Sequence, residues 1–145
     1  MKTIPQVQKF MTPMPHTVNA KMPLKTAFAM MREHGVRHIP VLEGGELVGV
    51  LTDRDVKLAG SFADAEKITA EDAMTPEPYT VAPEAPLDQV LTEMASHKYG
   101  CVLVRQQNGK LVGIFTATDA LRVLVELLHL NYRPANEDGR HSKSL

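Results

Sequence analysis

Apolar residues along this chain follow a helical spacing twice, 63 residues apart. Each set recurs at intervals of three and four residues, which places it on one face of a helix. The two sets are Leu24, Ala27, Phe28 and Met31, and Leu87, Val90, Leu91 and Met94. Pro23 precedes the first predicted helix and Gly35 follows it, as is typical of a helix start and stop.

Each predicted helix is followed by two short apolar runs with a glycine-containing turn between them, a pattern that predicts a β-hairpin. The predicted strands are residues 36–42 and 47–51 in the first half, and residues 101–105 and 111–115 in the second. A closing helix is predicted after each hairpin, over residues 52–59 and 118–130.

The two halves are copies of one unit. Met11-Thr12-Pro13 recurs as Met74-Thr75-Pro76, an offset of 74 − 11 = 63, and Leu47-Val48-Gly49 recurs as Leu111-Val112-Gly113, an offset of 64. The copies span residues 7–60 and 70–130, with a linker over 61–69 and a polar, mobile tail predicted over 131–145. One unit cannot bury both faces of its hairpin. We therefore predict an α+β fold in which two β-α-β-β-α repeats pack sheet to sheet about a pseudo-twofold axis, with a cleft at that axis.

Charge and composition exclude several classes of function. The formal net charge is −1, from 16 basic and 17 acidic residues, which favours neither nucleic acid nor an anionic membrane. The first residues resemble no signal peptide, and no apolar run is long enough to span a bilayer. We expect a cytoplasmic protein, in which the lone Cys101 is a small buried residue of a strand.

Three segments resemble the motifs of the cystathionine β-synthase (CBS) domain: Arg37-His38-Ile39-Pro40-Val41, Gly49-Val50-Leu51-Thr52-Asp53-Arg54-Asp55, and Gly113-Ile114-Phe115-Thr116-Ala117-Thr118-Asp119. The resemblance covers nearly all of the chain except its tail. It implies a compact pair of CBS motifs, homodimers of such pairs, and a cleft that binds AMP, ADP, ATP or S-adenosylmethionine. It also implies that Asp55 and Asp119 hold ribose hydroxyls and that Thr52 and Thr116 contact phosphate.

The residue types suit these roles, but they also suit a simpler one. A carboxylate accepts hydrogen bonds from a ribose diol, and a helix N-terminus attracts phosphate. Thr52-x-x-Asp55 and Thr116-x-x-Asp119 also have the spacing of a capping box, which only starts a helix. We favour ligand binding for the first copy. We favour capping for the second, because Leu103 stands where the family has Pro and Thr118 where the first copy has Arg54.

The remaining candidates each carry an alternative. Arg37 and His38 alternate along a strand, so one of them faces the cleft unless both are solvated at an edge. Arg54 reaches phosphate or is an ordinary surface residue, and Tyr99 with Gly100 borders adenine or belongs to the core. The full set of candidate ligand contacts is Thr17, Arg37, His38, Ile39, Pro40, Thr52, Arg54, Asp55, Thr80, Tyr99, Gly100, Thr116 and Asp119.

No sequence motif indicates an enzyme. The chain shows no nucleophile–base pair, no phosphate loop of the P-loop type and no histidine spacing typical of a metal site. We predict a regulatory module that needs no cofactor, senses an adenosine nucleotide and signals to an unidentified partner protein. The alternative is a ligand-free homodimeric scaffold. Four apolar residues of the last helix belong either to the core or to the seam of a homodimer: Leu121, Leu124, Val125 and Leu128.

Overall fold

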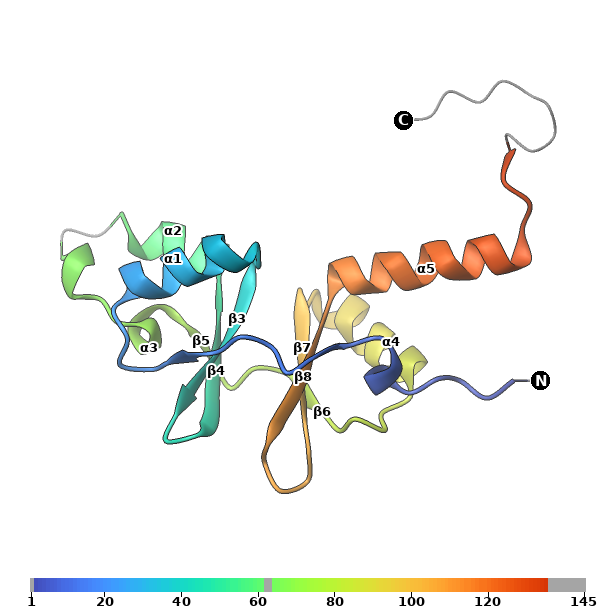
Figure 1. Cartoon of the computed structure of the whole chain (residues 1–145), viewed down its shortest axis with the longest axis horizontal. Helices are drawn as coiled ribbons and strands as arrows, with labels where there is room; N and C mark the ends of the chain where they lie inside the picture. The colour runs from blue at the N-terminus through green and yellow to red at the C-terminus, as the bar shows by residue number, and fades with distance from the viewer. Residues whose placement is uncertain (1, 62–63, 136–145) are drawn as a thin grey trace.

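The computed structural model describes residues 2–61 and 64–135 of the chain (Figure 1). Its helical elements are η1 (Val7–Lys9), α1 (Leu24–His34), α2 (Asp53–Ala59), η2 (Ala65–Lys67), α3 (Ala70–Ala73), α4 (Leu87–His97) and α5 (Ala117–Asn131). Its strands are β1 (Thr12–Pro13), β2 (Val18–Asn19), β3 (His38–Glu43), β4 (Glu46–Thr52), β5 (Thr75–Pro76), β6 (Thr80–Val81), β7 (Cys101–Arg105) and β8 (Leu111–Thr116). The predicted order of helices and hairpins is confirmed in both copies.

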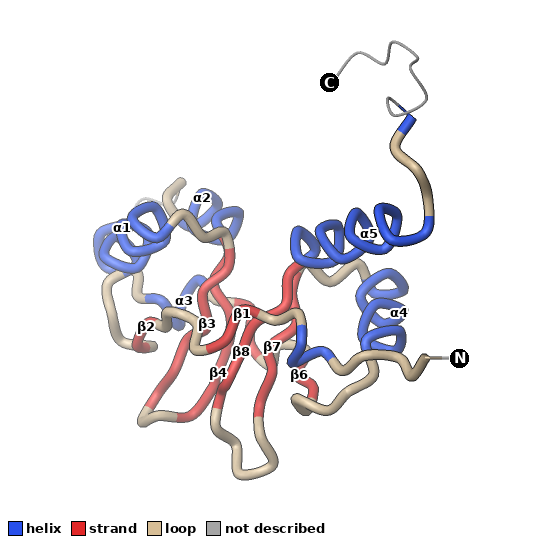
Figure 2. The backbone as a smooth tube through the Cα atoms, turned by 45° about the vertical axis from the view of Figure 1, so that its right-hand side comes forward, coloured by secondary structure: helices blue, strands red, loops and turns tan. Residues whose placement is uncertain are grey.

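The strands form two four-stranded sheets, in the orders β2-β3-β4-β5 and β1-β8-β7-β6. Figure 2 shows the sheets together in the middle of the molecule, with helices at either side. The first sheet takes its last strand from the second copy, since Pro76 of β5 lies opposite Gly49 of β4. In the same way Pro13 of β1 lies opposite Gly113 of β8. Each copy therefore completes the sheet of the other, an exchange that the repeat pattern alone did not predict.

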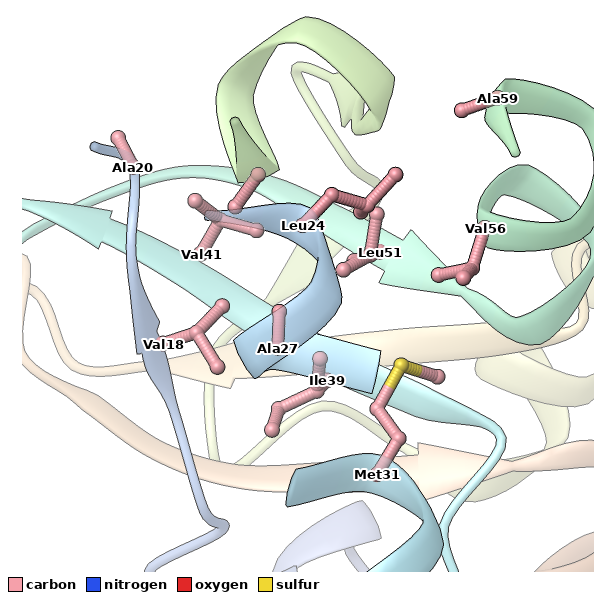
Figure 3. Close-up of a cluster of buried hydrophobic side chains, with 11 residues drawn as sticks. Val18, Ala20, Leu24, Ala27, Met31, Ile39, Val41, Leu51, Val56 and Ala59 are labelled. Atoms are coloured by element: carbon pink, nitrogen blue, oxygen red, sulfur yellow. The ribbon is translucent and has the colours of Figure 1, made fainter. Parts of the chain in front are cut away.

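Three clusters of buried side chains hold the layers together. One lies between the first sheet and helices α1, α2 and α3 (Figure 3), and an equivalent one lies in the second copy around Phe115. The third joins the two sheets through Val50 of β4, Leu103 of β7 and Ile114 of β8. This third cluster confirms the predicted packing of sheet against sheet.

Local chemistry sets the helix boundaries. Gly35 ends α1 with φ of 64°, a left-handed conformation that favours glycine. The N–H of Val36 still donates to the carbonyl of Met31 at 3.0 Å, so β3 begins at His38, two residues later than predicted. Capping boxes start both α2 and α5.

Four apolar residues of the last helix are not core residues of this chain. Val123 is 5% exposed, whereas Leu121, Leu124, Val125 and Leu128 are between 44% and 63% exposed. Figure 1 shows α5 extending beyond the body of the second copy. These four residues were predicted to belong either to the core or to the seam of a homodimer. Their exposure excludes the core, and the homodimer seam stays a prediction.

The segment between the copies is tied to the first of them. The carbonyl of Ile68 accepts a hydrogen bond from the N–H of Leu24 at 2.9 Å, and Ile68 packs against the first core. Residues 62–63 of the predicted linker lie outside the described part of the chain. The same holds for residues 136–145 of the predicted tail, whose first residue, Asn131, is the last of α5.

The strand exchange requires a bare backbone at two matched glycines. A Cβ added to Gly49 would lie 2.8 Å from the carbonyl oxygen of Thr75 and would also meet the Met74 side chain. The three atoms nearest to a Cβ added to Gly113 all belong to the side chain of Met11. A flexible methionine side chain can move aside, but the backbone of a paired strand cannot move without disturbing its hydrogen bonds.

We therefore expect Gly49→Ala to lower the free energy of unfolding by about 1–3 kcal/mol, the usual range for overpacking. Gly113→Ala should cost less, because its clash is relieved by a rotamer change in Met11. Urea denaturation of the two variants and the wild type measures both effects. Equal losses, or no loss at Gly49, would show that the exchanged strand does not lie as closely as described.

Candidate ligand-binding site

A cleft of about 570 Å³ lies where the two copies meet. Its walls are residues 12–16, which include β1, and residues 35–38, which lead into β3. Gly100, Ile114, residues 116–119 and Arg122 complete the lining from the second copy. Because β1 is paired with β8, the exchange of strands brings the first copy's Met-Thr-Pro segment beside the second copy's Thr-x-x-Asp motif. The volume lies within the range of small-molecule sites.

The second copy's motif starts α5 and also lines this cleft. One carboxylate oxygen of Asp119, Oδ2, accepts hydrogen bonds from the backbone N–H and the hydroxyl of Thr116, at 2.8 Å and 3.0 Å. In return, the Thr116 hydroxyl oxygen accepts from the N–H of Asp119 at 3.2 Å. Capping and lining the cleft are therefore compatible, since the cap uses one carboxylate oxygen and leaves Oδ1 outside it.

Oδ1 of Asp119 faces a cation one helical turn further along α5. It lies 3.5 Å from a guanidinium nitrogen of Arg122, whose side chain is 76% exposed. An exposed pair of this kind contributes little to stability, so its partners can separate easily.

Arg37 and His38 bring the first copy to the same cleft, and both line it, because Arg37 precedes β3 and does not alternate with His38 along a strand. The carbonyl of Arg37 accepts a hydrogen bond from the N–H of Asp53 at 3.0 Å, which fixes the start of β3 against the start of α2. The His38 ring packs on Gly100, where an added Cβ would lie 3.0 Å from Nε2. Gly100 is therefore one of the points at which the two copies touch within the cleft.

The pKa of His38 is lowered from its ordinary value. Burial is the main cause, because it disfavours the charged imidazolium, and the nearby Asp53 and Asp55 only partly offset it. His38 is therefore neutral at neutral pH and offers one donor and one acceptor nitrogen. Arg37 and Arg122 are the permanent cations of the cleft lining.

The first copy's motif has the same internal geometry but a different setting. Oδ2 of Asp55 accepts from the N–H of Thr52 at 3.1 Å and lies 3.4 Å from the hydroxyl of Thr75 on β5. Thr52 and Asp55 line neither this cleft nor the second pocket described below. The sequence favoured this copy for ligand binding, whereas the described cleft is built around Asp119.

The other predicted contacts are dispersed. Ile39 is fully buried in the first core and Pro40 is buried beside it, so neither side chain reaches the cleft. Arg54 is exposed on α2, and Thr80 lies on β6 opposite Leu103; both line neither pocket. The structure brings together Arg37, His38, Gly100, Thr116 and Asp119 from the predicted set.

Tyr99 and Thr17 lie elsewhere. The Tyr99 ring stacks on Tyr79 with 5.0 Å between ring centroids, outside the lining of both pockets. Thr17 lines a second pocket of about 580 Å³, which lies between the turns of the two hairpins and includes Glu46 and Lys110.

Sequence reasoning missed four polar residues that line the cleft: Thr12, His16, Thr118 and Arg122. His16 lines it and stacks on His34 at the end of α1, with 3.6 Å between the ring centroids. Arg122 lies three residues after Asp119, a spacing that places the two on one face of a helix. Its position beside Asp119 could therefore have been predicted from the sequence. The position of His16 could not, because only the exchange of β1 carries it to the second copy.

The remaining features concern the lone cysteine, metal-ligating side chains and membrane-spanning helices. Burial raises the pKa of the Cys101 thiol to about 12, in keeping with its place in the cluster between the sheets. Within residues 2–61 and 64–135, no three histidine, cysteine or acidic side chains gather as a metal site would require. No helix in this part of the chain is long and apolar enough to cross a membrane.

Fold and site together define a module of two repeated halves that share a cleft. The CBS domain family matches the chain twice, over residues 7–61 and 70–126. The chain therefore belongs to the CBS domain family, as its motifs indicated, and it carries one pair of these domains.

Known relatives include enzymes and ligand complexes. The chain is 34% identical over 118 residues to an inosine-5′-monophosphate dehydrogenase of Korarchaeum cryptofilum, a match that spans 81% of this chain but only 24% of the dehydrogenase. The crystal structure of CBSX2 in complex with AMP matches with a TM-score of 0.74 and 26% identity, over 85% of this chain and 98% of that one.

A third relative binds other adenosine compounds. The CBS domain pair of protein MJ0100, solved with 5′-methylthioadenosine and S-adenosyl-L-methionine, matches with a TM-score of 0.78 and 26% identity, over 86% of this chain and 98% of that one. The whole chain of each solved pair is thus represented here, whereas in the dehydrogenase the matching segment is one part of a longer protein.

Proposed function

We propose that this chain is a regulatory module that binds an adenosine nucleotide in the cleft around Asp119 and signals its occupancy to a partner protein. The observation that carries the proposal is the convergence of Arg37, Thr116 and Asp119 on one cleft of suitable size. The complexes of related CBS-domain pairs with AMP, 5′-methylthioadenosine and S-adenosylmethionine support the choice of ligand class.

The chemistry of the cleft assigns a role to each group. Oδ1 of Asp119 accepts from the ribose hydroxyls, since Oδ2 is held by the cap. The N-terminus of α5 attracts the phosphate, and Arg37 adds charge from the opposite wall. His38, neutral and packed on Gly100, borders the base or the ribose. No metal or resident cofactor takes part in this proposal.

The first copy provides a second, weaker site in the same proposal. Asp55 and Thr52 repeat the capping geometry of Asp119 and Thr116. The Thr75 hydroxyl already lies close to Asp55. We therefore expect one ligand per chain to bind first, in the cleft at Asp119.

Signalling requires a surface that a partner can read. The apolar face of α5 starts at the rim of the cleft and continues away from it, exposed from Leu121 to Leu130. We propose that this face forms a homodimer and that the dimer presents the occupied cleft to a further protein. A ligand-free scaffold, the alternative function, uses the same face but leaves the cleft empty.

Isothermal titration calorimetry separates these two functions. We expect saturable binding of AMP in the micromolar range with a stoichiometry close to one per chain. ADP, ATP and S-adenosylmethionine complete the panel, and circular dichroism shows that the sample is folded. A folded protein that gives no heat with any of them would reject the sensor and favour the scaffold.

A further inference from the structure

The described lining of the cleft has more positively charged side chains than negatively charged ones. Arg37 and Arg122 are permanent cations, and Asp119 is the one acidic side chain among the described lining residues. The described lining therefore carries a net charge of 2 − 1 = +1 when its histidines are neutral. Such a lining attracts an anion, and confinement in a cleft strengthens that attraction relative to open water.

Arg122 is the cation that lies beside the proposed ribose-binding oxygen. Its guanidinium lies 3.5 Å from Oδ1 of Asp119, the oxygen that the proposed function gives to the ribose. When the ribose hydroxyls occupy this oxygen, the guanidinium is free to pair with the phosphate of the same ligand. The side chain is 76% exposed, so little packing opposes this movement.

The first copy lacks this cation. The offset of 64 that relates Thr52 to Thr116 relates Leu58 to Arg122, and Leu58 is an exposed apolar residue. The two halves therefore share the Thr-x-x-Asp motif but differ in the charge one turn after it. The copy with this additional positive charge is the second, whose Thr-x-x-Asp motif lines the cleft.

We infer that Arg122 is the specificity-determining residue of the cleft, and that it selects adenosine ligands with a phosphate group over uncharged or sulfonium-bearing ones. The inference rests on the proposed function, which places an adenosine ligand at Asp119. A guanidinium forms paired, charge-assisted hydrogen bonds with phosphate. Adenosine offers it no anionic group, and S-adenosylmethionine, which has a sulfonium and an ammonium against one carboxylate, carries a net positive charge that it repels.

The test compares AMP, adenosine and S-adenosylmethionine by calorimetry on the wild type, Arg122→Gln and Arg32→Gln. The wild type should bind AMP at least tenfold more tightly than adenosine, and more tightly still than S-adenosylmethionine. Arg122→Gln should lose about tenfold in AMP affinity and less than twofold in adenosine affinity. Arg32→Gln is the matched control, because it removes the same charge near the end of α1, outside the cleft lining, and should change neither affinity by twofold.

Each outcome decides a separate point. If AMP and adenosine bind but Arg122→Gln weakens both equally or neither, Arg122 does not select phosphate, while the sensor function stands. Tighter binding of S-adenosylmethionine than of AMP by the wild type also overturns the inference. If none of the three binds, the inference fails, and if ADP and ATP also give no heat, the proposed function fails with it.

Discussion

Asp119→Asn should weaken AMP binding at least tenfold while the protein stays folded. The carboxylate has two proposed tasks that fall on different oxygens, since Oδ2 holds the Thr116 cap and Oδ1, beside Arg122, lies outside the cap. Asparagine keeps one carbonyl oxygen, which can still accept from the N–H of Thr116. It cannot at the same time accept from a ribose diol, because its second polar atom is an NH₂ donor.

Asp55→Asn is the matched control for this substitution. It makes the same chemical change in the same capping box of the first copy, outside the described cleft. Calorimetry with AMP should show an affinity within about threefold of the wild type for this variant. Thermal unfolding of both variants measures the loss of capping, which is worth about 1 kcal/mol or less. A larger loss of AMP affinity at Asp55 than at Asp119 would move the principal site to the first copy.

Leu124→Glu should convert a dimer into a monomer. Leu124 is 52% exposed in the middle of an apolar face that also includes Val125, Leu127 and Leu128, each at least 44% exposed. Exposed apolar surface of this extent on one helix is typical of an interface. A carboxylate at its centre has to be buried without a partner whenever the dimer forms, and such burial is strongly unfavourable.

Light scattering coupled to size exclusion measures the change directly. The wild type should have twice the chain mass of 16.0 kDa, and Leu124→Glu should have the chain mass itself. Leu58→Glu is the control, because Leu58 is also an exposed leucine, at 65%, on helix α2 of the other copy. A wild type of 16.0 kDa would remove the dimer from the proposal, and loss of the dimer in Leu58→Glu would place the seam on the first copy.

Much of the fold could be predicted because the repeat supplies every local pattern twice. The apolar spacing in α1 and α4, the glycine turns and the Thr-x-x-Asp caps are local features, and local features can be read from a sequence. The predicted packing of sheet on sheet followed from the unburied face of each hairpin. The structure confirms it through Val50, Leu103 and Ile114.

The exchange of strands could not be predicted in the same way. β1 and β5 are two residues long, and nothing in Thr12-Pro13 distinguishes pairing within its own copy from pairing with β8. Gly49 and Gly113 carried a usable signal, because each matched glycine makes room for the methionine of the other copy's Met-Thr-Pro segment.

The lining of the described cleft depends on that exchange, so the sequence alone did not indicate it, and which copy binds a ligand stays a prediction. Differences at Leu103 and Thr118 favoured the first copy as the binding half. Neither difference decides the matter, since Leu103 is buried between the sheets and the charges of the cleft come from Arg37 and Arg122. Asp119 remained in the candidate set because its residue type and spacing suited both capping and binding.

The exchanged strands also set the order in which the chain can fold as it is synthesised. The edge of β4 lacks its neighbour until Thr75 and Pro76 have left the ribosome, so the first hairpin emerges with an unpaired edge. β1 waits longer, because its partner β8 lies about 100 residues further along the chain. The wall of the cleft that β1 supplies is thus the first part to be made and among the last to be put in place. The ability to bind a ligand consequently appears only when nearly the whole pair has been translated.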